Sequence, residues 1–259
     1  MRWVLLFLAT FWTSVGYGQW FRHTSSHPLR LNINAIYGAP SGNFRNGGDN
    51  MFYGNARYGW GLDLSVSLHL NKGVYANLFY KHIAFTLDKD RFNAAVAVFY
   101  DKENHFTSPL SSWRREFFTN YFGMQLSRPF MVKGLEVMPC ANAGVLITEF
   151  TLSDRIRLYR KESGSNFSEE LTIDPKGSAS FFAGGGLRIS KTLLPIANIT
   201  ATILYSWSSN RLSFETTSED WLGNTKHVGS YAYIQPVTLL QVQLGFQVLL
   251  WRRSKLIPE

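Results

Sequence analysis

Residues 57–73, RYGWGLDLSVSLHLNKG, alternate between two kinds of side chain. A period of two over the thirteen residues 58–70 predicts a β-strand with one apolar face and one polar face. Strands of soluble proteins usually have about five or six residues, whereas a tilted strand needs roughly 9–11 residues to cross a bilayer. This segment is long enough to span a membrane with its apolar face toward lipid. The apolar positions are Tyr58, Trp60, Leu62, Leu64, Val66, Leu68 and Leu70, and the others are Gly59, Gly61, Asp63, Ser65, Ser67 and His69.

Seven more segments alternate in a related way, at 29–37, 74–87, 116–128, 135–148, 178–190, 197–208 and 237–251. The connections between the eight segments are in turn long (38–57, 88–115, 149–177, 209–236) and short (71–73, 129–134, 191–196). An even number of strands, short periplasmic turns and longer external loops are typical of outer-membrane barrels. Closure is also required, because an open sheet edge in lipid leaves backbone groups without partners. We predict an all-β fold, an eight-stranded antiparallel transmembrane β-barrel with up-and-down meander topology, over residues 19–251.

The first eighteen residues have the pattern of a secretory signal peptide. Arg2 precedes a short apolar run, VLLFLATFWTSV, and Gly16 and Gly18 stand at the −3 and −1 positions of a cleavage site. We therefore expect export, a signal peptide at 1–18 and a short periplasmic tail at 252–259. Cys140 is the single cysteine, which excludes an intrachain disulfide and zinc held by several cysteines.

Composition agrees with a membrane barrel. Aromatic residues make up 15% of the chain and charged residues 17%, whereas ordinary globular chains have about 25% charged residues. Membrane barrels need aromatic girdles. The net charge of +8 is scattered rather than gathered in one run, so we do not expect a nucleic-acid partner. The alternative is a soluble lipocalin-like barrel with the two faces exchanged, but strand length and the alternation of long and short connections favour the membrane.

The turn Asn71-Lys72-Gly73 predicts the pairing of its two strands. A three-residue hairpin with glycine in the left-handed position is a favoured connection, and it pairs Leu70 with Val74. Asp63 then lies opposite Lys81, with both side chains facing inward together with Tyr75, Asn77 and Phe79. The other register turns Lys81 toward lipid, at a cost of about 2–4 kcal/mol.

Charged side chains are expected on the inner face. An eight-stranded barrel is about wide enough for side chains to fill its lumen, and charges in a narrow interior require partners. We predict charge pairs that plug the lumen, with a narrow ion pathway as the alternative. The predicted residues are Arg30, Lys81 and Arg188 against Asp63, Glu116 and Glu136.

No catalytic or metal motif is predicted, and no cofactor. Ser67, His69 and Asp63 share one face, but alternate residues on a strand lie about 6.6 Å apart, too far for a nucleophile and its base. The loop sequence DKENH, with Asp101, Glu103 and His105, is a weak cation candidate that a solvated loop explains better.

The segment Tyr37-Gly38-Ala39-Pro40-Ser41-Gly42-Asn43-Phe44, followed by a glycine-rich loop and Gly59-Trp60-Gly61-Leu62, resembles the small outer-membrane barrels related to OmpA and OmpX. The last strand resembles the signal read by the barrel-assembly machinery, at Gln243, Gly245, Val248 and Leu250. Family members end at an aromatic residue, whereas here Trp251 is followed by RRSKLIPE. The resemblance implies the assembly machinery as a partner during biogenesis.

The expected location is the outer membrane of a Gram-negative cell, with lipid and lipopolysaccharide as surroundings. Arg155, Arg157 and Arg160 are candidates for lipopolysaccharide contact, because clustered arginines suit phosphate; their alternation with Ile156 and Leu158 is also compatible with strand ends that project from the membrane. We expect a monomeric, non-enzymatic barrel with a plugged polar lumen and four long surface loops, in a structural, surface-interaction or envelope-assembly role with an unknown surface or periplasmic partner. The alternatives are a lipid-modifying outer-membrane enzyme and a narrow small-solute channel.

Overall fold

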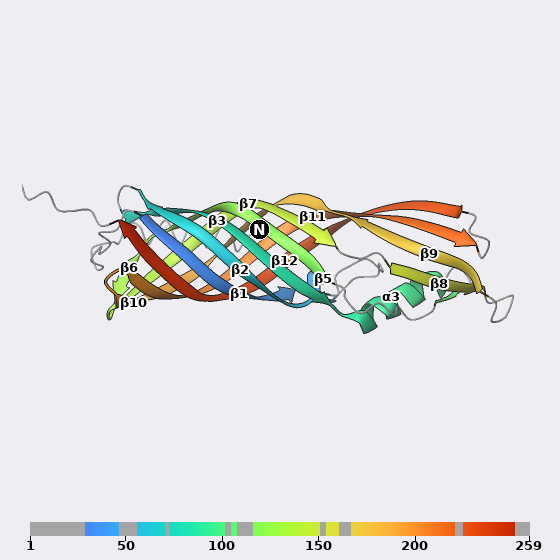
Figure 1. Ribbon diagram of the computed structural model, residues 1–259, viewed down its shortest axis with the longest axis horizontal. Coiled ribbons are helices and arrows are strands. Elements are labelled where there is room, and N and C mark those ends of the chain that lie inside the picture. Colours follow the sequence, from blue (N-terminus) through green and yellow to red (C-terminus); the bar gives the residue numbers. More distant parts are fainter. Residues whose placement is uncertain are drawn as a thin grey trace, which may run out of the picture.

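The computed structural model describes residues 29–46, 56–70, 73–101, 105–107, 116–150, 154–160, 167–220 and 225–251, and the predicted signal peptide and tail lie outside these ranges. Each strand of the barrel is hydrogen-bonded to its neighbours in antiparallel fashion, and β12 pairs with β1 to close it (Figure 1). The predicted eight-stranded antiparallel barrel is confirmed. Its strands are β1 (Leu29–Ser41), β2 (Ala56–His69), β3 (Tyr75–Leu87), β5 (Glu116–Ser127), β7 (Leu135–Phe150), β10 (Ser178–Leu194), β11 (Ala197–Asp220) and β12 (Thr225–Trp251).

The two ends of the barrel differ. One end, here named the turn end, carries the three short connections, the start of β1 and the end of β12 (left in Figure 1). The opposite end, the loop end, carries α2 (Asn43–Asn46) and α3 (Lys89–Asp101). At the turn end Leu70 N donates to Val74 O at 2.7 Å, and Asp63 pairs with Lys81 in the register that the turn predicts. The short β6 (Phe130–Val132) joins β7 through Lys133 and Gly134, both with positive φ, as a two-residue hairpin turn of type I′ requires.

The prediction of loops at 149–177 and 209–236 was wrong. β11 and β12 continue as a paired hairpin beyond the barrel, from Arg211 opposite Ile234 to Glu219 opposite Thr225. β9 (Phe167–Lys176), β8 (Asp154–Arg160) and β4 (His105–Thr107) add beside β11, which gives an outer sheet in the order β12-β11-β9-β8-β4 (right in Figure 1). The predicted loop 88–115 contains α3 and β4, β1 and β2 extend into 38–57, and β10 runs on to Leu194. The physical reason is that segments such as SNRLSFETTSED carry polar residues on both faces. Strands that pair outside lipid therefore show no contrast between an apolar and a polar face in the sequence.

The outer wall of the barrel is apolar. Large apolar side chains stay exposed along every described barrel wall, for example Trp60 at 62% and Leu244 at 61%. Tyr58, Tyr205 and Trp207 are also about half exposed and lie toward the loop end. A wall of this kind fits lipid, with aromatic side chains at the interface. Among the described residues no helix is long and apolar enough to cross a membrane.

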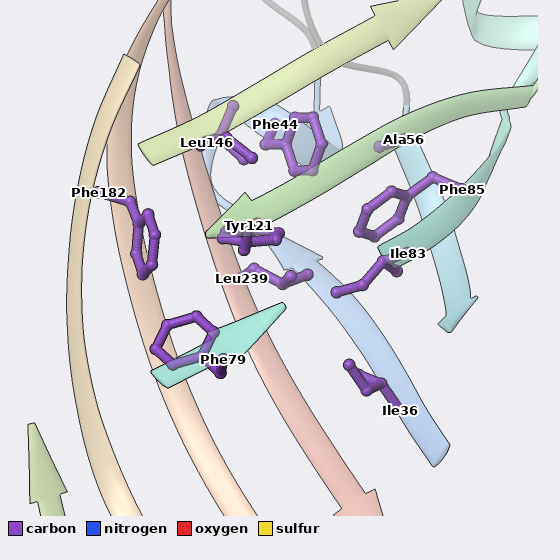
Figure 2. Packing of buried hydrophobic residues seen from close by; sticks show 11 residues of the cluster. Ile36, Phe44, Ala56, Phe79, Ile83, Phe85, Tyr121, Leu146, Phe182 and Leu239 are labelled. Carbon is purple, nitrogen blue, oxygen red and sulfur yellow. The ribbon is translucent and has the colours of Figure 1, made fainter. Parts of the chain in front are cut away.

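The lumen has two zones. Toward the turn end the buried inward side chains are mostly polar, whereas toward the loop end the interior contains an apolar cluster (Figure 2), with buried polar side chains such as Asn210 and Thr148 in the same half. Phe44 of α2 covers this cluster at the loop end, with its ring centroid 5.5 Å from that of Phe85. The apolar zone was not predicted, because the sequence pattern indicates a polar lumen. The cluster comprises Ile36, Phe44, Ala56, Phe79, Ile83, Phe85, Tyr121, Leu146, Phe182, Val237 and Leu239.

Candidate functional site in the barrel lumen

An ion pair crosses the lumen near the turn end. Arg30 and Glu136 form two hydrogen bonds of 3.0 Å, from Nη1 to Oε2 and from Nη2 to Oε1. Their strands, β1 and β7, stand four positions apart in the ring of eight, so the pair joins opposite walls. Both side chains are nearly inaccessible, with 3% and 11% exposed. A bidentate pair of this geometry is the arrangement in which buried charges best satisfy each other.

Three neighbours complete this turn-end layer. Arg30 Nη2 also donates to Tyr75 Oη at 2.9 Å, and the guanidinium carbon lies 4.2 Å from the Tyr75 ring centroid. Ser190 Oγ donates to Glu136 Oε2 at 3.0 Å, and Gln247 Oε1 accepts from Arg30 Nη1 at 3.3 Å. The layer therefore connects side chains of β1, β3, β7, β10 and β12.

A second polar layer lies in the middle of the lumen. Gln243 stands between Asp63 and Lys81: one amide atom is 2.9 Å from Asp63 Oδ2 and the other is 3.2 Å from Lys81 Nζ. With its nitrogen toward the carboxylate and its oxygen toward the ammonium group, both contacts are hydrogen bonds. Lys81 also donates to Gln241 Oε1 at 3.4 Å, and Asn34 donates to Asp63 Oδ2 at 3.4 Å. Asp63 and Lys81 are thus linked through a neutral amide rather than by a direct ion pair.

The remaining two predicted lumen charges are Arg188 and Glu116. Arg188 Nε donates to Thr202 Oγ1 at 3.2 Å, and Arg188 is opposite Met138 on β7. Glu116 begins β5 opposite Thr86 at the loop end, and its side chain lies outside the described part of the chain. Among the described inward charges, Arg30, Lys81 and Arg188 therefore face Asp63 and Glu136.

Several buried polar atoms of the lumen have no hydrogen-bond partner among the described residues. They include Asp63 Oδ1 of the middle layer, Arg188 Nη2, Gln125 Nε2 and both side-chain polar atoms of Asn142. Buried polar atoms are almost always hydrogen-bonded, to protein or to water. Water can bind at these atoms.

The other predicted candidates are separated. Asn32 donates to Ser67 Oγ at 3.0 Å, whereas the His69 ring packs 5.0 Å from that of Tyr75, so Ser67 and His69 act in different contacts. Within the described ranges, no group of three or more His, Cys, Asp or Glu is placed to hold a metal ion. Asp101 ends α3 and His105 begins β4, while Glu103 is outside the described residues.

The predicted lipopolysaccharide contacts Arg155, Arg157 and Arg160 lie on β8 of the outer sheet, and nothing is described of their side chains. Their strand conformation matches the alternative of strand ends that project beyond the membrane.

The residues of the predicted assembly signal lie along β12. Gln243 belongs to the middle layer, while Leu250 faces outward and is 53% exposed. Val248 is half-buried opposite Leu31. At Gly245 an added Cβ would lie 2.1 Å from Ile33 O, so this position requires glycine for close strand contact. Recognition by the assembly machinery stays a prediction.

Sequence reasoning missed the neutral partners of the buried charges. Gln241, Gln243 and Gln247 stand on one face of the last strand, a polar row that was visible as a period of two. Their contacts with Lys81, Asp63 and Arg30 depend on how the barrel closes, because β12 meets β1 only after the whole chain has wound round.

No protein-family model and no curated protein sequence matches the chain. The solved structures to which it is similar include those of three outer-membrane proteins. The major outer membrane protein from Thermus thermophilus has a TM-score of 0.47 at 13% identity, over 86% of this chain and 99% of that chain. Neisserial surface protein A has 0.42 at 13%, over 86% and 97%, and outer membrane protein OprG from Pseudomonas aeruginosa has 0.45 at 11%, over 86% and 95%. Judged by its own closed strand pairing, apolar outer wall and partly polar lumen, this chain is a small β-barrel of the outer-membrane type.

Proposed function

We propose that the protein is an exported, non-enzymatic outer-membrane barrel whose lumen is plugged and whose role lies in its outer sheet. The observation that carries this proposal is the filled lumen. A bidentate ion pair joins opposite walls at the turn end, and the apolar cluster occupies the loop-end half. An ion that enters the lumen must break the ion pair and must lose its hydration water at the apolar cluster, and each step costs free energy.

The outer sheet offers a surface for interaction. Ser208, opposite Phe182, is the last residue of β11 that pairs with β10, and β11 continues for twelve residues after it. Twelve residues correspond to roughly 40 Å of strand at about 3.3 Å per residue. In the outer-membrane orientation, with short turns in the periplasm, this sheet stands outside the cell. Structural support, surface interaction and envelope assembly are the roles that such a projection serves.

Conductance of the refolded mature barrel in a planar bilayer tests the plug. Gel mobility before and after boiling identifies the folded fraction. We expect no steady conductance from the wild type. The positive control is the double variant Phe79→Ala, Phe182→Ala. It removes from the apolar cluster two rings whose centroids lie 6.1 Å from each other, and we expect it to conduct ions. Steady conductance of the folded wild-type barrel would contradict the proposal.

A narrow small-solute channel is the second candidate. It is favoured by the buried polar atoms of the lumen that have no protein partner among the described residues, Asp63 Oδ1 and Arg188 Nη2 among them. Water at these atoms would form the middle part of a pathway, with the ion pair and the apolar cluster as its gates. Wild-type conductance that rises in the variant Glu136→Ala would establish this function instead.

A further inference from the structure

We propose that a pocket at the loop-end rim binds a phosphate group, supplied by an outer-leaflet glycolipid. The pocket has a volume of about 420 Å³ and lies at the loop end, where residues of β1, β2, α2 and the start of α3 line it. Three arginines and one carboxylate line it: Arg45, Arg57, Arg91 and Asp88. The inference rests on the proposed membrane placement but not on the plugged lumen.

A β-bulge aims Arg57 into the pocket. Between Ala56 and Gly59 the pairing of β2 with β3 gains one residue, because Ala56 is opposite Leu87 and Gly59 is opposite Phe85. As a result two consecutive side chains, Arg57 and Tyr58, are exposed on a strand that otherwise alternates. Bulges re-aim side chains in this way and are frequent at barrel rims and functional sites.

The two helices position the other arginines. Phe44 is buried in the apolar cluster, with 3% exposed, and fixes α2, which carries Arg45. Asp88 caps α3, since its Oδ1 accepts from Arg91 N at 3.3 Å and its carbonyl accepts from Phe92 N at 3.0 Å. Phe92 is buried and anchors the helix, so Arg91 is held over the same pocket.

The arginines retain donors for a ligand. Arg57 Nε lies 3.3 Å and Arg91 Nε 3.8 Å from Asp88 Oδ2, and both side chains are 53% exposed. A guanidinium has five N–H donors, and within the described chain no contact involves the guanidinium of Arg45. One carboxylate against three arginines leaves a net charge of +2 in the pocket. Paired, exposed guanidinium groups are the side chains best suited to phosphate.

The aromatic side chains give the height of the pocket relative to the membrane. Tyr37 and Tyr58 line it, with ring centroids 6.2 Å apart, and the Tyr37 ring contacts Trp60 at 4.9 Å. Tyrosine and tryptophan on the outside of a barrel mark the level of the lipid headgroups. The phosphate groups of a glycolipid in the outer leaflet lie at this level. A soluble phosphate ion would have to compete with them for the pocket.

Native mass spectrometry of the full mature chain in detergent, with bisphosphorylated lipid A as the probe, tests the proposal. Replacing all three arginines by glutamine (Arg45→Gln, Arg57→Gln, Arg91→Gln) should weaken lipid A binding at least tenfold. The matched control removes three positive charges elsewhere (Arg128→Gln, Lys191→Gln, Arg211→Gln) and should change binding less than threefold. Equal losses in the two triple variants, or equal binding of dephosphorylated lipid A to the wild type, would overturn the proposal.

Two further experiments test whether the phosphate comes from a lipid or from solution, and whether Asp88 competes with it for the arginines. Inorganic phosphate at 10 mM should not displace lipid A, and displacement would assign the pocket to the soluble ion and overturn the glycolipid source. Asp88→Asn keeps a good helix cap but removes the competing carboxylate, so lipid A should bind several-fold more tightly; unchanged or weaker binding would contradict a phosphate site. Gel mobility before and after boiling confirms that each variant is folded, and the lumen conductance is measured separately.

Discussion

The two halves of the lumen are filled by different physical means. Toward the loop end, apolar side chains such as Leu146 and Phe182 exclude water by packing. Toward the turn end, Arg30 and Glu136 are buried only because each satisfies the other and their neighbours supply further hydrogen bonds. Apolar packing depends on volume, and volume-conserving exchanges are tolerated. A buried polar layer depends on the identity of every partner.

The polar half itself divides by how completely its charges are paired. The turn-end layer has a direct, bidentate pair, whereas the middle layer connects Asp63 and Lys81 through the Gln243 amide. Since direct charge-assisted hydrogen bonds are stronger than neutral ones, the coupling between charges should fall from the turn end to the middle.

The largest effect is expected at the turn end. Glu136→Ala leaves the buried Arg30 guanidinium without its carboxylate, and removal of one partner from a buried ion pair costs about 3–5 kcal/mol. Urea unfolding of the barrel in lipid vesicles, followed by tryptophan fluorescence, measures the loss of unfolding free energy.

The control for Glu136→Ala is an exposed glutamate. Glu215 on β11 pairs with Lys176 on β9, but both side chains are about half exposed, and exposed ion pairs contribute about 0–1 kcal/mol. If Glu136→Ala cost no more than Glu215→Ala, the ion pair across the lumen would not stabilise the barrel.

In the apolar half, size should matter more than chemical identity. Leu146 is fully buried, so Leu146→Ala is expected to cost about 2–5 kcal/mol through lost burial and a cavity. Leu146→Met keeps the volume and should cost less than about 1.5 kcal/mol. The same unfolding measurement compares the two, and similar losses for both variants would mean that this half is not held by packing volume.

This division explains what the sequence could and could not predict. Strand positions in the membrane wall follow from a period of two with contrasting faces, and the Asn71-Lys72-Gly73 turn gave the register that places Asp63 opposite Lys81. The outer strands were missed because polar residues on both faces of 209–220 leave no contrast between the faces. The partnership of Arg30 with Glu136 joins residues 106 positions apart, and it depends on the diameter and closure of the barrel, which local periodicity does not contain.

A smaller effect is expected for the middle layer. In a double-mutant cycle with Asp63→Asn and Lys81→Gln, we expect a coupling energy of about 1 kcal/mol, because the two charges interact through an amide. The cycle Arg30→Ala with Glu136→Ala should give a larger coupling under the same conditions. Equal couplings would indicate that direct contact does not distinguish the two layers.

The smallest effect is expected at the rim, where the pocket places an ion pair in contact with water. Partial burial acts to raise the pKa of Asp88, but the hydrogen bond and charge of Arg57 and the Arg91 amide outweigh it, so the pKa lies below the ordinary 3.8. A carboxyl group whose pKa is lower in the folded state stabilises the fold at pH values above its pKa in the unfolded state. This contribution is lost as the pH falls through the pKa of the folded state. The Arg57 Nε–H resonance of the detergent-solubilised barrel should therefore stay constant from pH 7 to about pH 4.5 and shift only below the ordinary carboxyl pKa of 3.8. A midpoint between pH 4.5 and 6 would show that the carboxylate is not held by the arginines, and the same titration of Asp88→Asn, which should be flat, assigns the shift to this side chain.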